Sequence, residues 1–254
     1  MLTARNIFIG NLAISDLLLC TFTMPLTLTD LLAKYWFMGK DMVRENLLWN
    51  RNLWFPPWQE ILCKLLGTTQ SSCVFFSSFS IVLIAIDRYF FIVHSTSTQI
   101  DTAQAFLLSG VSLGTSIILS FPLFSLTRLE VKYSLLTGAA YSYCYEGWEA
   151  DYGRLPYSST CLLIQYLIPS AIVALAYTRI SQKLDRQTNS VFSSHKKSRQ
   201  LARRKRTNSL LIVVSFIFFL SWAPINTLNI ISDLSGETKV LPLTVFCILI
   251  NTWG

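Results

Sequence analysis

Two polar residues near the C-terminal end of the chain, Asn229 and Asp233, are spaced so that they could bind a ligand together. They are four residues apart, so a helix would place them on one face. A carboxylate such as Asp233 can accept two parallel hydrogen bonds from a guanidinium, while a neutral amide such as Asn229 both donates and accepts. The alternative is that Asp233 is a solvated acid at the end of a helix.

Other isolated polar side chains interrupt apolar stretches of the sequence. They are Asp16, Gln70, Ser77 and Gln165. Polar groups inside a membrane are costly and usually face a partner or a cavity, although they can also serve only to join neighbouring helices. Asp16 follows Arg5 by eleven residues, or about 16 Å of helix, which predicts a carboxylate near the middle of a bilayer.

The composition is that of a membrane protein. Of the 254 residues, 52% are hydrophobic and only 14% are charged, too few charges to cover a soluble globule of this size. We therefore expect no soluble enzyme. The net charge of +7 could suit nucleic acid, but ten Lys and Arg lie between Arg179 and Arg206 against one acid, Asp185. Because the excess is confined to this segment, we expect no nucleic-acid partner.

Long apolar blocks predict the elements that position these residues. A bilayer core of about 30 Å needs roughly 20 apolar residues per helix. The predicted spans are 6–32, 61–93, 103–126, 157–180 and 208–234, with a partial span at 240–254 and a basic loop at 181–206. The sequence therefore predicts an all-α fold, a polytopic transmembrane helix bundle that forms a single domain over residues 1–254.

The charge distribution predicts the orientation of the spans. Lys and Arg accumulate on cytoplasmic loops, so the loop at 181–206 is predicted to lie inside. The inner side then carries twelve basic and three acidic groups, and the outer side nine basic and ten acidic groups. Cys63 and Cys144 both fall outside, where an oxidising compartment permits a disulfide; two unrelated thiols are the alternative.

Several short motifs follow one another along nearly the whole chain. They are Asn11-Leu12-Ala13 with Asp16, Cys63, Asp87-Arg88-Tyr89, Cys144, Pro169 with Tyr177, and Phe218 with Trp222-Ala223-Pro224. In this order and at these spacings they resemble the rhodopsin-like (class A) G protein-coupled receptors. The resemblance implies a multi-pass plasma-membrane receptor, not an enzyme, of the seven-helix type. It also implies that the family's first helix and part of its last helix are missing from this sequence.

Two stretches narrow the resemblance to neuropeptide F and neuropeptide Y receptors. They are Arg5-Asn6-Ile7-Phe8-Ile9 and Thr23-Met24-Pro25-Leu26-Thr27. The resemblance implies that Gln70, Gln165 and Asn229 line a peptide pocket and that Asp233 meets an arginine of the ligand. The implied ligand is a peptide that ends in an arginine and an amidated aromatic residue. Gln70 stands where amine receptors carry an acid, which argues against an amine ligand.

The same resemblance assigns residues to signalling. The implied activation switch comprises Asp87, Arg88, Tyr89, Tyr177, Phe218, Trp222 and Pro224. Asp87 would restrain Arg88 at rest, and activation would release Arg88 to a heterotrimeric G protein, of the inhibitory class in this family. Asp16 with Ser77 resembles an allosteric sodium site, and no other cofactor is expected. Each aromatic residue could instead be ordinary helix packing.

Some features depart from the family pattern. The stretch 41–59 looks like an insertion, either a true loop or an artefact of the gene model, and Ser78 stands where a branched apolar residue is common. The missing ends leave a second interpretation, a non-signalling receptor fragment that acts only by association with full-length receptor. Receptor copies and membrane lipids are therefore candidate partners beside the peptide and the G protein. The basic loop could bind the G protein, anionic lipid or calmodulin.

Overall fold

A computed structural model describes residues 3–33, 57–94, 100–133, 140–148, 153–190 and 195–235. The predicted partial span at 240–254, and all but the last three residues of the stretch 41–59, lie outside the described residues. Contacts divide the chain into two compact units. The first unit holds the described residues of Met1–Leu12, Phe76–Ser112 and Arg154–Gly254, and the second holds those of Ala13–Phe75 and Leu113–Gly153.

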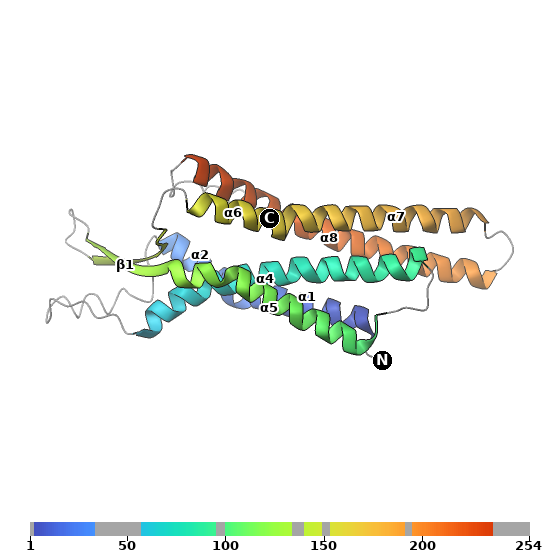
Figure 1. Cartoon of the computed structure of the whole chain (residues 1–254), viewed down its shortest axis with the longest axis horizontal. Coiled ribbons are helices and arrows are strands. Elements are labelled where there is room, and N and C mark those ends of the chain that lie inside the picture. Colours follow the sequence, from blue (N-terminus) through green and yellow to red (C-terminus); the bar gives the residue numbers. More distant parts are fainter. Residues whose placement is uncertain are drawn as a thin grey trace. The chain divides into compact units, whose positions relative to one another are not determined.

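Helices make up most of the described chain (Figure 1). In chain order the elements are α1 (Ala4–Leu18), the π-helical segment η1 (Leu19–Thr23), α2 (Met24–Ala33), α4 (Pro57–Tyr89), the π-helical segment η3 (Phe90–His94), α5 (Thr102–Leu126), β1 (Thr127–Tyr133), β2 (Ala140–Glu146), α6 (Arg154–Leu162), the π-helical segment η4 (Leu163–Leu167), α7 (Ile168–Ser190) and α8 (His195–Ser235).

Five helical stretches are long and apolar enough to cross a membrane. They are Ala4–Thr29, Trp58–Val93, Thr102–Leu126, Arg154–Gln187 and Leu201–Ile231. Many of their large apolar side chains are exposed, as at Leu107 and Ile118 of α5, which are 68% and 72% exposed. Such surfaces suit lipid, where a helix satisfies its own backbone hydrogen bonds. The predicted all-α membrane fold with five full spans is confirmed.

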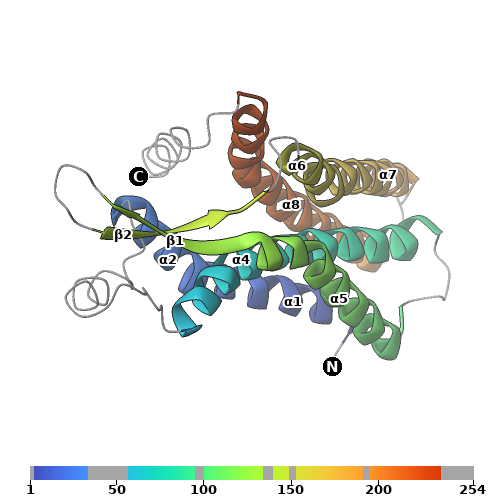
Figure 2. The ribbon, with the colours of Figure 1, turned by 60° about the vertical axis from the view of Figure 1, so that its left-hand side comes forward.

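The segment expected as a basic loop is mostly helical. Helix α7 continues to Ser190 and α8 begins at His195, so both helices run past the predicted loop boundaries at 181 and 206. Lys, Arg and Gln are good helix formers, so nothing in this segment stops a helix where the apolar residues end. An ion pair of 2.8 Å between Asp185 and Lys205 joins the two helices, which run side by side (Figures 1 and 2).

The core of the first unit is an apolar cluster built from several helices. Its buried members are Leu12 of α1, Ile81 and Ala85 of α4, Ile92 of η3, and Val173, Ala176, Tyr177, Ile180 and Leu184 of α7. Phe218 and Phe219 of α8 pack against this cluster. A hydrogen bond of 2.7 Å from Asn11 to Ser109 also joins α1 to α5, the kind of polar link that holds membrane helices together.

A β-hairpin in the second unit was not predicted. Strands β1 and β2 pair antiparallel (Figure 2). In their register, Leu129 lies opposite Cys144. The hydroxyl of Tyr145 donates a hydrogen bond of 2.8 Å to Glu130, and this bond raises the pKa of the exposed phenol above its ordinary value. The connection between the predicted spans 103–126 and 157–180 thus contains regular structure.

Candidate functional site

The first feature of the site is an ion pair between α6 and α8. Arg154 is the first residue of α6, and its Nε atom lies 3.1 Å from Oδ1 of Asp233 near the end of α8. The Asp233 side chain is only 1% exposed, whereas that of Arg154 is 31% exposed. Although the distance makes an ion pair, neither oxygen of Asp233 accepts a well-angled hydrogen bond from the described residues. The carboxylate therefore keeps acceptor capacity for a second donor.

The other two predicted ligand residues of the first unit lie on the same two helical stretches. Asn229 is exposed on α8, one turn before Asp233, so both side chains share the face that the spacing predicts. Gln165 is half-buried in η4. Gln70 belongs to the second unit, where Thr27 donates a hydrogen bond of 3.3 Å to its Oε1 atom. The shared ligand pocket of these residues stays a prediction.

A proline in α7 explains an unusual contact of the Gln165 backbone. Pro169 has no N–H group, so the carbonyl four residues earlier, that of Gln165, loses its helical donor. The hydroxyl of Ser78 on α4 replaces this donor with a hydrogen bond of 2.7 Å to the Gln165 oxygen. A serine where the family commonly has a branched apolar residue thus satisfies a buried backbone group.

Replacing Ser78 by alanine should lower the free energy of unfolding by about 1–2 kcal/mol, because the Gln165 carbonyl would be left unpaired. Ser80 offers a matched control on the same helix, since its buried hydroxyl has no hydrogen-bond partner in the part of the chain that the structure describes. We expect Ser80→Ala to be neutral or stabilising. Thermal unfolding of both variants in the same detergent measures the difference, and equal melting temperatures would contradict this role of Ser78.

Aromatic rings connect η4 with α8. The ring centroids of Tyr166 and Phe219 are 5.7 Å apart, and those of Phe219 and Phe218 are 5.4 Å apart. Phe218 in turn lies 6.3 Å from Trp222. Pro224 follows within α8 and removes one backbone hydrogen bond. The structure therefore brings the predicted residues Phe218 and Trp222 into contact, and their role as a relay stays a prediction.

The predicted switch residues at the other end of the spans are also in contact. Nε of Arg88 donates a hydrogen bond of 2.9 Å to Oδ2 of Asp87, and its Nη2 atom contacts the same oxygen. Their side chains are 17% and 6% exposed. Tyr89 is half-buried, and Tyr177 is buried in the apolar cluster of the first unit. The pairing of Asp87 with Arg88 is the arrangement expected of a restrained switch, and its role in signalling stays a prediction.

The two residues of the expected sodium site belong to different units. Asp16 lies in the second unit and is exposed on α1, whereas Ser77 lies in the first and is fully buried on α4. Each residue is placed only within its own unit. The sodium site therefore stays a prediction.

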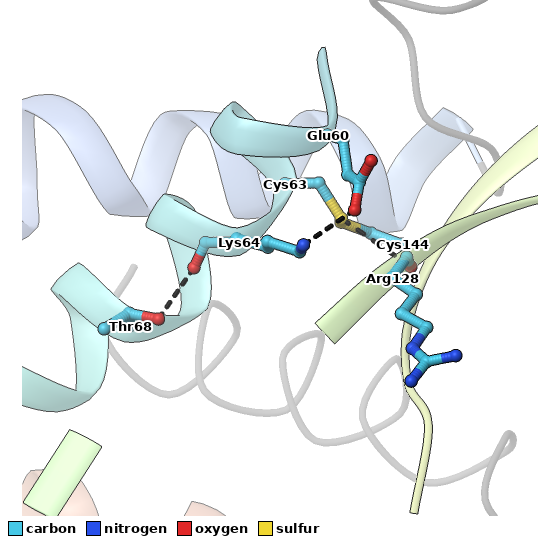
Figure 3. Close-up of a disulfide and its surroundings, with 6 residues drawn as sticks. All are labelled: Glu60, Cys63, Lys64, Thr68, Arg128 and Cys144. Atoms are coloured by element: carbon cyan, nitrogen blue, oxygen red, sulfur yellow. Dashed lines mark hydrogen bonds and ion pairs between the residues drawn. A yellow bond between two sulfur atoms is a disulfide. The ribbon is translucent and has the colours of Figure 1, made fainter. Parts of the chain in front are cut away.

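Figure 3 shows the disulfide between Cys63 and Cys144, which confirms the predicted pair. Their Cα atoms are 5.9 Å apart, and they have a sequence separation of 81. Leu66 is buried beside Cys63, and Leu129 of β1 packs against this small cluster. Lys64 and Glu60 form an ion pair of 2.7 Å on the same helix. The disulfide thus ties the β-hairpin to the beginning of α4.

Sequence reasoning missed Arg154, Ser78 and Thr27 as partners of the predicted residues. Arg154 was one of nine outer basic residues with nothing to distinguish it. For Ser78 a signal existed, because Pro169 frees a carbonyl that needs a donor. The identity of that donor depends on packing between α4 and η4 and cannot be read from the sequence alone.

Comparison with known families defines the class of the protein. The 7 transmembrane receptor (rhodopsin family) pattern matches residues 48–253, most of the chain. The chain belongs to the rhodopsin family of seven-transmembrane receptors, and so it is a multi-pass plasma-membrane receptor rather than an enzyme.

The particular relatives are peptide receptors. The chain is 37% identical to the neuropeptide F receptor of Drosophila melanogaster over 92% of this chain and 47% of that protein. It is 32% identical to mouse neuropeptide Y receptor type 4, over 90% of this chain and 57% of the receptor. It is 29% identical to human neuropeptide Y receptor type 2, over 100% and 60% respectively. The chain thus spans about half the length of these relatives.

Proposed function

We propose that this chain acts as a receptor for an amidated neuropeptide of the neuropeptide F/Y type and transmits peptide binding to a heterotrimeric G protein of the inhibitory class. The observation that carries the proposal is the buried Asp233 carboxylate, paired at 3.1 Å with the guanidinium of Arg154. A site that already holds one guanidinium has the chemistry to hold the arginine of a peptide. The similarity to neuropeptide F and Y receptors supports the same ligand class.

The neutral amides around Asp233 suit the other end of such a peptide. Asn229 lies one turn from Asp233 and Gln165 lies on η4, and each amide can donate to a carbonyl and accept from an amidated terminus. Gln70 of the second unit completes the proposed set by resemblance to the family. A free carboxylate at the peptide terminus would oppose Asp233 electrostatically, so the amidated form is preferred.

Signal transfer in this proposal runs along the first unit. Peptide binding would shift the rings of Trp222 and Phe218, which touch one another on α8. The break at Pro224 lets α8 bend, and the bend would release Arg88 from Asp87 for contact with the G protein. A sodium ion at Asp16 and Ser77 would favour the resting state, as the family resemblance implies. Contacts with lipids and with other receptor copies belong to the proposal as well.

Cells that express this chain test the proposal. They should show saturable binding of a radiolabelled peptide that ends in an arginine and an amidated aromatic residue, and the peptide should lower cyclic AMP through an inhibitory G protein. The free-acid form of the same peptide is the control and should bind at least about tenfold more weakly. Absence of saturable binding would contradict the proposal. No observation on the described residues favours the alternative of a non-signalling fragment, and we do not propose it.

A separate variant tests the proposed transfer of the signal to the G protein. Replacing Arg88 by alanine should abolish the cyclic AMP response, because the released guanidinium is the proposed contact for the G protein. Peptide binding should persist, since Arg88 is far along α4 from the amide residues of the pocket. Retention of a full response in this variant would contradict the assigned role of Arg88.

A further inference from the structure

A cavity of about 220 Å³ lies in the first unit, between the beginning of α1, the end of α4 with η3, and residues 203–208 of α8. Four arginines line it, namely Arg5, Arg88, Arg203 and Arg204, together with Phe91 and Asn208. Each arginine lies close to the end of a membrane-length stretch, since these stretches begin at Ala4 and Leu201 and one ends at Val93. The cavity is therefore at the depth where lipid headgroups and water meet the apolar core.

The cavity has a large excess of positive charge. None of the residues that line it is acidic. Arg88 pairs with Asp87, but within the described ranges no carboxylate forms an ion pair with Arg5, Arg203 or Arg204. Four guanidiniums thus share a single neighbouring carboxylate, and like charges held this close repel one another.

The ring of Phe91 makes cation–π contacts with two of these guanidiniums. The Cζ atom of Arg88 lies 5.2 Å from the centroid of the Phe91 ring, and that of Arg204 lies 5.1 Å from the same centroid. Cation–π contacts of this kind orient a planar guanidinium and leave its N–H groups free to bind oxygen. An anion that bridges Arg88 and Arg204 would remove the repulsion between them.

We propose that this cavity binds a phosphate-bearing anion that bridges α4 and α8. Phosphate fits because its oxygens accept the paired N–H groups of several arginines at once. The volume of about 220 Å³ is below the roughly 300–1,000 Å³ of sites for larger organic ligands, so a small charged group is favoured. The source is either the headgroup of a phosphoinositide, which carries phosphomonoesters that phosphatidylserine lacks, or a free polyphosphate.

Asn208 adds a neutral contact to the cavity. Its side chain is 5% exposed, and Oδ1 has no hydrogen-bond partner among the described residues. The oxygen and nitrogen of an amide can exchange places by rotation, so Asn208 can present its NH₂ group to a phosphate oxygen. A bound anion would thus satisfy a buried polar group as well as the arginines.

The test compares two variants that remove equal charge from one helix. Arg203→Gln with Arg204→Gln removes two of the four arginine charges that line the cavity. Arg199→Gln with Arg206→Gln removes two exposed charges of α8 outside the cavity. In the first arm, the purified chain in phosphatidylcholine nanodiscs is titrated with inositol trisphosphate. In the second arm, the chain is reconstituted in nanodiscs whose own bilayer contains phosphatidylinositol bisphosphate, and binding of that lipid is measured. Phosphatidylserine nanodiscs control for negative charge alone.

We expect the double variant in the cavity, Arg203→Gln with Arg204→Gln, to bind the phosphate probe about tenfold or more weakly than the unaltered chain. The control double variant, Arg199→Gln with Arg206→Gln, should lose less than about threefold. Arg5→Gln on α1 provides an independent variant if the cavity pair unfolds, and should weaken binding about threefold. Binding of phosphatidylinositol bisphosphate without binding of inositol trisphosphate shows that the phosphates must belong to a lipid in the bilayer. Binding of inositol trisphosphate shows that a free anion is enough. Equal losses in the two pairs, equal binding of phosphatidylserine, or no binding by the unaltered chain would each overturn the proposal.

Discussion

Replacing Asp233 by alanine is expected to weaken binding of an arginine-containing amidated peptide by about 30- to 100-fold, because a buried charge-assisted bond to a guanidinium is worth roughly 2–3 kcal/mol. The side chain is only 1% exposed, so water could not replace the carboxylate in that bond. Radioligand competition on cells that express each variant measures the effect.

The control for this prediction uses the peptide rather than the receptor. An analogue with alanine in place of its arginine has no guanidinium to lose, so Asp233→Ala should change its affinity by less than about threefold. The two receptors and two peptides form a double-mutant cycle that isolates the pairwise term. Equal losses for both peptides would show that Asp233 acts on the fold and does not pair with the ligand.

For Arg154 we expect the opposite effect on peptide affinity, because its guanidinium is paired with Asp233 when no peptide is bound. Replacing Arg154 by glutamine should destabilise the empty receptor, since the buried carboxylate loses its cation. The same loss should strengthen binding of the arginine-containing peptide, since a ligand guanidinium no longer competes with Arg154. Weaker binding together with unchanged thermal stability would instead make Arg154 a direct ligand contact.

The spans were predictable, whereas their ends were not. Apolar blocks must be helical in lipid because every backbone group needs an internal partner, and the stretches Trp58–Val93 and Thr102–Leu126 follow the predicted spans 61–93 and 103–126 closely. Hydropathy reports where lipid ends, however, and not where a helix ends. Helix α8 therefore begins at His195 rather than near the predicted 208, through charged residues that favour helix.

The β-hairpin carried a sequence signal that was not used. From Arg128 to Tyr133 polar and apolar residues alternate strictly, with Leu129 and Val131 between charged neighbours, which is the pattern of a half-buried strand. This pattern spans only a few residues, far fewer than the apolar blocks that predict the membrane spans. The register that sets Leu129 opposite Cys144 does not follow from the alternation, which fixes the face on which a residue lies but not the residue opposite it on the partner strand.

The contacts of the candidate site could be predicted from the sequence only where both residues lie on one helix. The sequence predicts that Asn229 and Asp233 share a face, because that follows from helical geometry alone. It does not predict that Arg154 pairs with Asp233, or that Ser78 pairs with the carbonyl of Gln165. Both pairs join different helices, and partner choice between helices depends on how their faces meet.

Removing the disulfide by Cys63→Ser with Cys144→Ser is expected to lower the free energy of unfolding by about 2–4 kcal/mol. The bond closes a long loop, because the two cysteines have a sequence separation of 81. A two-stranded hairpin is marginally stable in water by itself, and apart from this bond the hairpin contacts α4 through the small cluster around Leu66 and Leu129. The loss should therefore appear first as local opening of β1 and β2.

Hydrogen exchange locates this opening, and a matched variant controls for the chemistry of the substitution. Amide protection should fall in Thr127–Tyr133 and Ala140–Glu146, while amides in α7 keep theirs. Cys20→Ser with Cys73→Ser replaces two cysteines that form no disulfide among the described residues and should leave the hairpin protected. The single variants Cys63→Ser and Cys144→Ser should each cost about as much as the pair, because either one breaks the same bond. Additive losses from the two single variants would mean that each cysteine stabilises the protein by its own packing and that the bond contributes little.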